Sequence, residues 1–153
     1  MVDGNGDADR GFVALTDTAC WQLLSQVRVG RLAWADADGH IVIVPVNFGL
    51  NCHTIIIRTG ETTLLDAARA ARRCAFQAED LEPGLRSGWT VLLDGTLTEV
   101  EDEGDAERLG QLVDPWLREP RPHVLVLAAT QATGRCLRAA GGVVVEVEAE
   151  ERF

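Results

Sequence analysis

The sequence predicts a mainly β fold, a six- to seven-stranded antiparallel barrel with short flanking helices. Segments with β-branched residues and period-two alternation recur along the chain, and turn-forming residues separate them. Helical patterns between these segments are too few for the alternating strand-helix order of a parallel sheet. An antiparallel sheet of this size hides its edges by closing into a barrel or half-barrel.

The chain of 153 residues has the length of one domain and the composition of a globular protein, with 46% hydrophobic and 25% charged residues. Residues 1–11 hold three glycines and three aspartates without an apolar pattern. We therefore expect a flexible acidic tail over residues 1–11 and a single domain over residues 12–153.

Three short helices are expected. Thr16 is a candidate N-cap, because Cys20, Leu23, Leu24 and Val27 follow it at helical spacing. A glycine at the end of this pattern is typical of a helix C-terminus. The expected helices run from Thr16 to Gly30, from Thr62 or Thr63 to Arg72, and from Asp105 to Val113.

Seven strands are expected, and two of them contain a residue that interrupts a regular strand. Pro45 cannot donate a hydrogen bond to a neighbouring strand, so it indicates an edge position or a bulge. Gly95 lies inside a long strand, where glycine often marks a sharp bend. The expected strands are residues 31–35, 40–48, 53–59, 74–79, 89–101, 123–129 and 142–148.

The charge balance excludes several function classes. The net charge of −10 argues against a nucleic-acid partner, which needs a cationic face. All fourteen basic residues are arginine, so chemistry that depends on a lysine is absent. The longest apolar run is residues 41–46, far short of a membrane helix, and the N-terminus lacks a secretory pattern. We expect a cytoplasmic protein with neither a membrane nor a nucleic-acid partner.

The cysteines and histidines show no metal-binding pattern. The sequence has no C-x-x-C pair and no H-E-x-x-H helix, so we expect no metal site. In a reducing compartment the thiols stay free. The four cysteines expected to be reduced are Cys20, Cys52, Cys74 and Cys136.

The segment from Arg58 to Thr63 is the most informative candidate for a binding site. It follows a strand, precedes a helix, and offers a guanidinium with the hydroxyls of Thr59, Thr62 and Thr63. Such a set of donors can hold a phosphate group. The alternative is an ordinary strand-to-helix turn in which the threonines cap the helix.

Two further features could face a planar ligand. Around Pro45, Val46 and Asn47 the proline frees neighbouring backbone groups, which could meet the polar edge of a ring, or it only marks a bulged edge strand. Trp89 and Trp116 both follow turn residues and could provide an aromatic wall, or they pack in the core or at an interface.

A second copy of the chain is expected as a partner. Strands that are apolar at every position need cover on both faces, and three short helices are too few to supply it. We therefore expect a homodimer. The continuous apolar runs are residues 41–46, 55–57 and 124–127.

The order of these segments resembles the pyridoxamine 5'-phosphate oxidase-like, flavin-binding split barrels, over about residues 13 to 140. The matching segments are Leu15-Thr16, Cys20-Trp21, Val29-Gly30-Arg31-Leu32-Ala33, Val44-Pro45-Val46-Asn47-Phe48, Ile57-Arg58-Thr59, Ala75-Phe76, Ser87-Gly88-Trp89-Thr90-Val91, Pro115-Trp116 and Thr133-Gly134-Arg135.

The resemblance implies a dimeric split β-barrel with two sites for flavin mononucleotide (FMN) across the dimer interface. The implied phosphate contacts are Arg58 and Thr59, with Thr62 and Thr63 beside them. The segment Pro45-Val46-Asn47 would lie beside the flavin ring, and Trp89 near the site or the interface. The sequence departs from the family where Leu64 replaces a phosphate-contacting lysine, and Glu61 adds a negative charge nearby.

The implied function is a flavin-dependent oxidoreductase that acts on a small-molecule redox substrate. The flavin supplies the electron chemistry, so we assign no catalytic acid or base. Three alternatives remain open: a non-catalytic ligand-binding or sensor protein, a deazaflavin-dependent reductase, and a haem-binding relative with His53 or His123 as candidate ligands.

Overall fold

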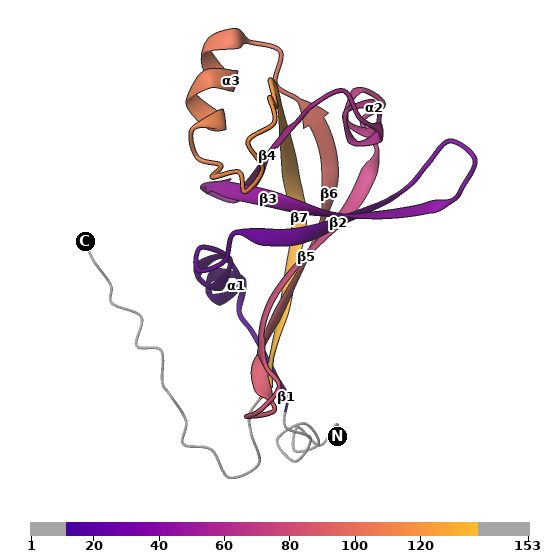
Figure 1. Ribbon diagram of the computed structural model, residues 1–153. Coiled ribbons are helices and arrows are strands. Elements are labelled where there is room, and N and C mark those ends of the chain that lie inside the picture. The colour runs from indigo at the N-terminus through magenta and orange to yellow at the C-terminus, as the bar shows by residue number, and fades with distance from the viewer. Residues whose placement is uncertain (1–11, 138–153) are drawn as a thin grey trace.

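The computed structural model describes residues 12–137 and confirms the predicted fold class. These residues form seven antiparallel strands and three short helices (Figure 1). The elements in chain order are β1 (Phe12–Ala14), α1 (Asp17–Leu24), β2 (Val29–Ala35), β3 (Ile41–Asn51), β4 (Thr54–Thr59), α2 (Thr63–Arg69), β5 (Arg73–Glu82), β6 (Ser87–Glu99), α3 (Glu103–Gly110) and β7 (His123–Leu137).

Six of the strands close into a barrel. The order of the hydrogen-bonded strands is β1-β7-β4-β3-β2-β5-β6, and β6 also pairs with β7, which closes the ring. The short β1 adds to the far end of β7. In Figure 1 helices α2 and α3 lie at one end of the molecule, and the hairpin of β2 and β3 projects from its side.

The predicted bend at Gly95 is confirmed by the pairing of β6 with β7. Their register shifts between Asp94 and Gly95, where β7 accommodates one extra residue. A side chain at position 95 would collide with the carbonyl oxygen of Ala128 on the neighbouring strand. Glycine is therefore required here, because the bulge that bends the long strand brings two backbones too close for a Cβ atom.

Two hydrophobic clusters account for two of the three apolar runs. Ile55 and Ile57 point into the main core inside the barrel, while Ile56 points to the other face of β4. There Ile56 packs with Val124 of β7 and with Leu109 at the end of α3. Helix α3 thus covers the outer face of residues 55–57 and 124–127 within one chain. Only the run in β3 keeps exposed apolar side chains.

Several expected boundaries were wrong because distant contacts decide them. Helix α1 ends at Leu24, and Gly30 lies inside β2, where a Cβ atom would overlap the ring of Phe76. Strand β7 continues from the expected end at residue 129 to Leu137, since β6 offers it a partner from Leu125 to Leu137. Strand β1 was not expected. The predicted tail, residues 1–11, and the predicted strand 142–148 lie outside the described residues.

The remaining helix boundaries shift by a few residues. Thr16 caps α1 as predicted, and its hydroxyl accepts a hydrogen bond from the Ala19 amide at 3.2 Å. The second helix ends at Arg69 rather than Arg72, and α3 begins at Glu103 with Asp102 as its cap. Within residues 12–137 there is no helix long and apolar enough to cross a membrane.

All four cysteines have free thiols, and they differ in burial. Cys20 and Cys74 lie in the main core, Cys136 is partly buried, and Cys52 is exposed in the turn between β3 and β4. Burial raises the pKa of the Cys74 thiol to about 11 and also raises the pKa of Cys20. Burial protects these two thiols in two ways. It blocks access by a reagent, and it raises the pKa, which disfavours the reactive thiolate.

We expect a thiol reagent to modify Cys52 first in the folded protein, with Cys74 and Cys20 reacting only on unfolding. Mass spectrometry after a short exposure at neutral pH measures the order, and the Cys52→Ser variant should lose the fast phase. In denaturant all four thiols should react together. Rapid labelling of Cys74 in the folded state would contradict this assignment of the core.

Candidate functional site

The candidate site lies where β3 and β4 separate. Residues Phe48–Asn51 of β3 pair with Ile57–Thr54 of β4. The first half of β3 pairs only with β2, over Ile41–Asn47. Among the described strands, the other edge of residues 41–47 therefore has no partner. Pro45 lies on this edge, so the predicted edge position is confirmed, opposite Arg31 of β2.

The eight predicted site residues do not all face the same way. The side chains of Val46, Thr59 and Trp89 are buried. Pro45 is exposed, and Asn47 and Arg58 are partly exposed. Asn47 and Arg58 lie on the outer face of β3 and β4, opposite to the face of their buried neighbours Val46 and Thr59. Thr62 and Thr63 are exposed at the start of α2. The split thus brings together Pro45, Asn47 and Arg58 on one face, with the threonine loop at the end of β4.

Asn47 ties the split to the segment that follows α3. Its amide oxygen accepts a hydrogen bond from the Trp116 backbone N–H at 3.0 Å. Its amide nitrogen donates to the Arg28 carbonyl oxygen at 3.5 Å. The Trp116 side chain is 70% exposed although its backbone is held in place. Of the two candidate aromatic walls, Trp116 is therefore the accessible one, and Trp89 packs in the core.

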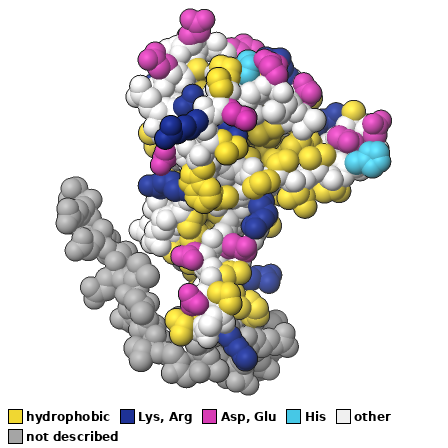
Figure 2. Space-filling model, in the orientation of Figure 1, with side chains coloured by type: hydrophobic (Ala, Val, Ile, Leu, Met, Phe, Trp, Pro, Cys, Tyr) yellow, Lys and Arg dark blue, Asp and Glu magenta, His cyan; other side chains and the backbone are white. Residues whose placement is uncertain are grey.

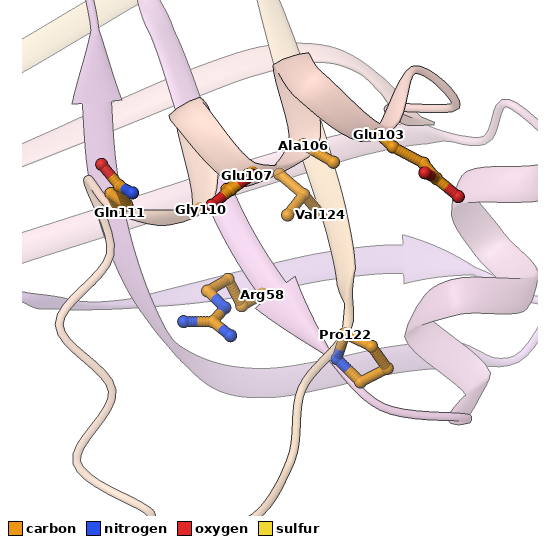
Figure 3. A pocket seen from close by; sticks show the side chains of 8 residues that line it. All are labelled: Arg58, Glu103, Ala106, Glu107, Gly110, Gln111, Pro122 and Val124. Atoms are coloured by element: carbon orange, nitrogen blue, oxygen red, sulfur yellow. The ribbon is translucent and has the colours of Figure 1, made fainter.

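Arg58 lies in a cavity of about 380 Å³ between β4, β7 and α3. Figure 3 shows its side chain below α3, with Val124 and Pro122 of the neighbouring segment beside it. The Nε atom donates to the Arg121 carbonyl oxygen at 3.2 Å. This contact fixes the guanidinium against the segment that also carries Trp116, because residues 111–122 bridge from α3 to β7.

The loop between β4 and α2 holds the predicted hydroxyls. The Thr59 and Thr62 hydroxyls form a hydrogen bond with each other at 2.9 Å, and Thr62 makes no side-chain capping bond to α2. Thr59 is 4% exposed and Thr62 is exposed, so the pair runs from the core to the surface. Leu64, where the resemblance implies a phosphate-contacting lysine, is buried in the main core. A cation for this loop must come from another residue.

A chain of alternating charges lies beside this loop, and the sequence analysis assigned it no such role. His123, directly opposite Thr59 in the β4–β7 pair, has Nδ1 2.9 Å from Glu99 and Nε2 2.7 Å from Glu61. Arg69 of α2 donates to both carboxylate oxygens of Glu99, at 2.9 and 3.4 Å. Only the strand register, which places Thr59 opposite His123, could have revealed this arrangement from sequence.

The hydrogen bonds from Arg69 lower the pKa of Glu99 and outweigh the opposing effect of desolvation, and His123 makes a smaller contribution in the same direction as Arg69. Glu99 is therefore ionised over the ordinary pH range, and the oxygen that faces His123 can only accept a hydrogen bond. The interaction also joins α2 to the end of β6, beside the loop.

The histidines proposed as haem ligands have other contacts. Both ring nitrogens of His123 lie against carboxylates. The ring of His53 stacks on Trp21, with the centroids 5.0 Å apart. Neither histidine presents an unengaged imidazole over a pocket, so the structure does not favour this alternative.

One group of possible metal ligands occurs among residues 12–137, at the tip of the β2–β3 hairpin. Asp36, Asp38 and His40 lie close enough to share an ion. Asp36 already accepts hydrogen bonds from the backbone N–H groups of Asp38 and His40, both at 2.9 Å. These bonds account for the cluster as part of a tight turn.

Comparisons with known proteins agree with this fold. The model of the pyridoxamine 5'-phosphate oxidase family matches residues 16–136. The uncharacterized protein Rv0080 of Mycobacterium tuberculosis is 31% identical over 130 residues, which is 82% of this chain and 85% of that protein.

Two solved structures share the same architecture. The FAD-binding protein from Mycobacterium smegmatis is 32% identical, with a TM-score of 0.71, and the match covers 84% of this chain and 100% of that one. An FAD-binding protein from Mesorhizobium loti is 23% identical, with a TM-score of 0.71, over 82% of this chain and 97% of that one.

The fold and the separated strands define a class of small antiparallel barrels with a split between two strands. Within this class, the chain belongs to the pyridoxamine 5'-phosphate oxidase family, because the family model matches most of its length. The resemblance found in the sequence is thereby confirmed.

The charge chain makes a prediction about stability. A carboxyl group whose pKa is lowered by folding stabilises the protein at pH values above the ordinary pKa of that group, 4.5. This contribution disappears as the pH falls through the lowered pKa. We expect Glu99→Gln to lower the free energy of unfolding by about 1 kcal/mol or less at neutral pH, and by nothing measurable in acid.

Urea unfolding at neutral and acidic pH measures this difference. The matched control is Asp94→Asn, which removes the more exposed ion pair with Arg73 and should have a smaller effect. A cost for Glu99→Gln that is equal at every pH would show that the side chain acts by packing rather than by charge.

Proposed function

We propose that the protein binds a flavin nucleotide in the split between β3 and β4 and works as a flavin-dependent oxidoreductase. The observation that carries the proposal is the edge of residues 41–47, which has no partner among the described strands and ends beside Arg58 and the threonine loop. The Mycobacterium smegmatis relative is an FAD-binding protein and is 32% identical to this chain, which supports a flavin nucleotide as the ligand.

The residues around the split suit the three parts of a flavin nucleotide. The backbone of the free edge near Pro45 and Asn47 offers hydrogen-bonding groups to the polar edge of the ring. Trp116 is an accessible aromatic surface beside Asn47. Arg58 and the hydroxyls of Thr62 and Thr63 lie near the end of β4, where a phosphate would bind.

A bound flavin would supply the electron transfer, and the protein would bind it, orient it and leave one ring face open to a small-molecule redox substrate. The sequence favours FMN, whereas the Mycobacterium smegmatis relative favours FAD. Both contain a phosphate on the ribityl chain, so the same residues serve either. The free thiols further support a place in the cytoplasm.

We expect Arg58→Ala to weaken binding of FMN and FAD much more than binding of riboflavin, which has no phosphate. A charge-assisted hydrogen bond contributes about 1.5–3 kcal/mol, so the nucleotide affinity should fall roughly tenfold to hundredfold. Titration calorimetry with the three flavins measures this and ranks FMN against FAD.

The control is Arg73→Ala, which removes the same charge from an exposed pair with Asp94 on another part of the barrel. Equal losses for riboflavin and the nucleotides would remove Arg58 from the phosphate site. Bound flavin that no nicotinamide donor reduces, and that after reduction with dithionite passes electrons to no small-molecule substrate, would favour the non-catalytic alternative.

We further propose that the protein is a homodimer whose interface includes the projecting β2–β3 hairpin. Ile41 and Ile43 are 70% and 62% exposed, and Pro45 follows on the same face. Figure 2 shows hydrophobic side chains along this arm. By the strand register the face continues through Ala33 and Ala75. Helix α3 covers the other apolar runs, so this face is the one that a second copy would cover.

We expect the parent protein to have a dimer mass and Ile43→Asp to be a folded monomer, because the side chain is exposed in the single chain and a charge opposes burial in an interface. An interface that persists at micromolar concentration should bury more than about 1,200 Å² in total. Light scattering with size-exclusion chromatography measures the mass.

Leu85→Asp is the matched control, since Leu85 is 66% exposed in the distant turn between β5 and β6. A parent protein that is monomeric at all concentrations, or an Ile43→Asp variant that remains dimeric, would contradict the proposed interface.

A further inference from the structure

His123 makes two short contacts that define its charge. Each ring nitrogen lies within hydrogen-bonding distance of a carboxylate oxygen, Nδ1 of Glu99 and Nε2 of Glu61. A carboxylate can only accept hydrogen bonds, and neutral imidazole has a single N–H to donate. Both contacts are favourable together only when both nitrogens carry a proton. The geometry therefore describes an imidazolium between two carboxylates.

The other groups packed around His123 leave it as the cation nearest to Glu61 in this charge chain. From β4 the opposite residue is Thr59, which is neutral. From α2, Arg69 donates hydrogen bonds to Glu99, and the charges of Glu61 and Asp66 also act on Arg69 through space. With charged His123 the set of Arg69, Glu99, His123 and Glu61 is neutral. Without that proton it has a net charge of −1.

Glu61 belongs to the loop that carries the proposed phosphate contacts. It lies between Thr59 and Thr62, whose hydroxyls bond each other, and its side chain is 76% exposed. An uncompensated carboxylate in this loop would repel a phosphate group. Leu64 is buried in the core and offers no charge that could offset it. His123, at 22% exposure, is fixed by Glu99 on its other side.

We propose that His123 is a positioning residue for the flavin phosphate, which in its charged form neutralises Glu61 and makes the loop of residues 59–63 able to accept an anion. The inference rests on the proposed flavin binding and adds its regulation: the nucleotide binds more tightly when His123 is charged than when it is neutral. The imidazolium thus provides a compensating charge in direct contact with Glu61.

Two ligands separate this effect from others. FAD keeps the charge of its diphosphate across the range in which imidazoles titrate, about pH 5 to 8, whereas the phosphate monoester of FMN itself titrates near pH 6. Riboflavin has no phosphate. We expect the dissociation constant of FAD to rise roughly tenfold across this range, because one unit charge changes near a partly exposed site. The dissociation constant of riboflavin should change little.

The variants test whether His123 acts through Glu61. Glu61→Gln should bind FAD at high pH as tightly as the parent does at low pH, with a flat pH profile. His123→Gln should bind FAD weakly at every pH, and adding Glu61→Gln to it should restore the affinity. His40→Gln, which removes the exposed histidine at the hairpin tip, should keep the parent profile.

FAD binding that is independent of pH in the parent, or a Glu61→Gln profile as steep as the parent's, would overturn this inference and leave the flavin proposal standing. A double variant that binds as weakly as His123→Gln would show a structural role for His123. Should His123→Gln fail to fold, the Glu61→Gln profile alone decides. Absence of both FAD and FMN binding at every pH would overturn both proposals.

Discussion

The change of partners along β3 is the constraint on which the rest of the structure depends. Its second half completes the barrel by pairing with β4, while its first half follows β2 away from the barrel. Proline at position 45 is tolerated because, among the described strands, this part of β3 is paired on one side only. The same departure creates the split, exposes the apolar face of the hairpin, and brings Asn47 within reach of the segment after α3. One topological feature thus links the candidate binding site to the proposed interface.

The segment of residues 111–122 makes the split a defined site rather than a frayed edge. Its backbone bonds to Asn47 through Trp116 and to Arg58 through Arg121, so one segment contacts both strands that separate. Leu109 of helix α3, which precedes it, and Val113 of the segment itself pack against β4 and β7. Packing of the outer cluster therefore positions the polar groups of the split.

The sequence was sufficient for the fold but not for the grouping of the site residues. Period-two patterns and turn residues predict most strands, because those signals are local. The end of α1 and the length of β7 depend on Phe76 and on β6, which are distant in sequence. Arg58 and Thr59 were predicted as one phosphate cluster, although strand alternation already places neighbouring residues on opposite faces. The His123 contacts required the register of β4 with β7, which no local pattern contains.

Loss of the family's lysine need not make the loop inert, since electrostatic compensation can come from a different strand. Position 64 serves the core here, and the charge beside the loop belongs to a histidine paired across from Thr59. Lysine keeps its charge throughout the physiological range, whereas histidine can lose it. On the proposed role of His123, a constant positive charge is exchanged for a conditional one. In a chain without lysine and with a net charge of −10, such a conditional charge beside the proposed anion site would have more influence than on a basic surface.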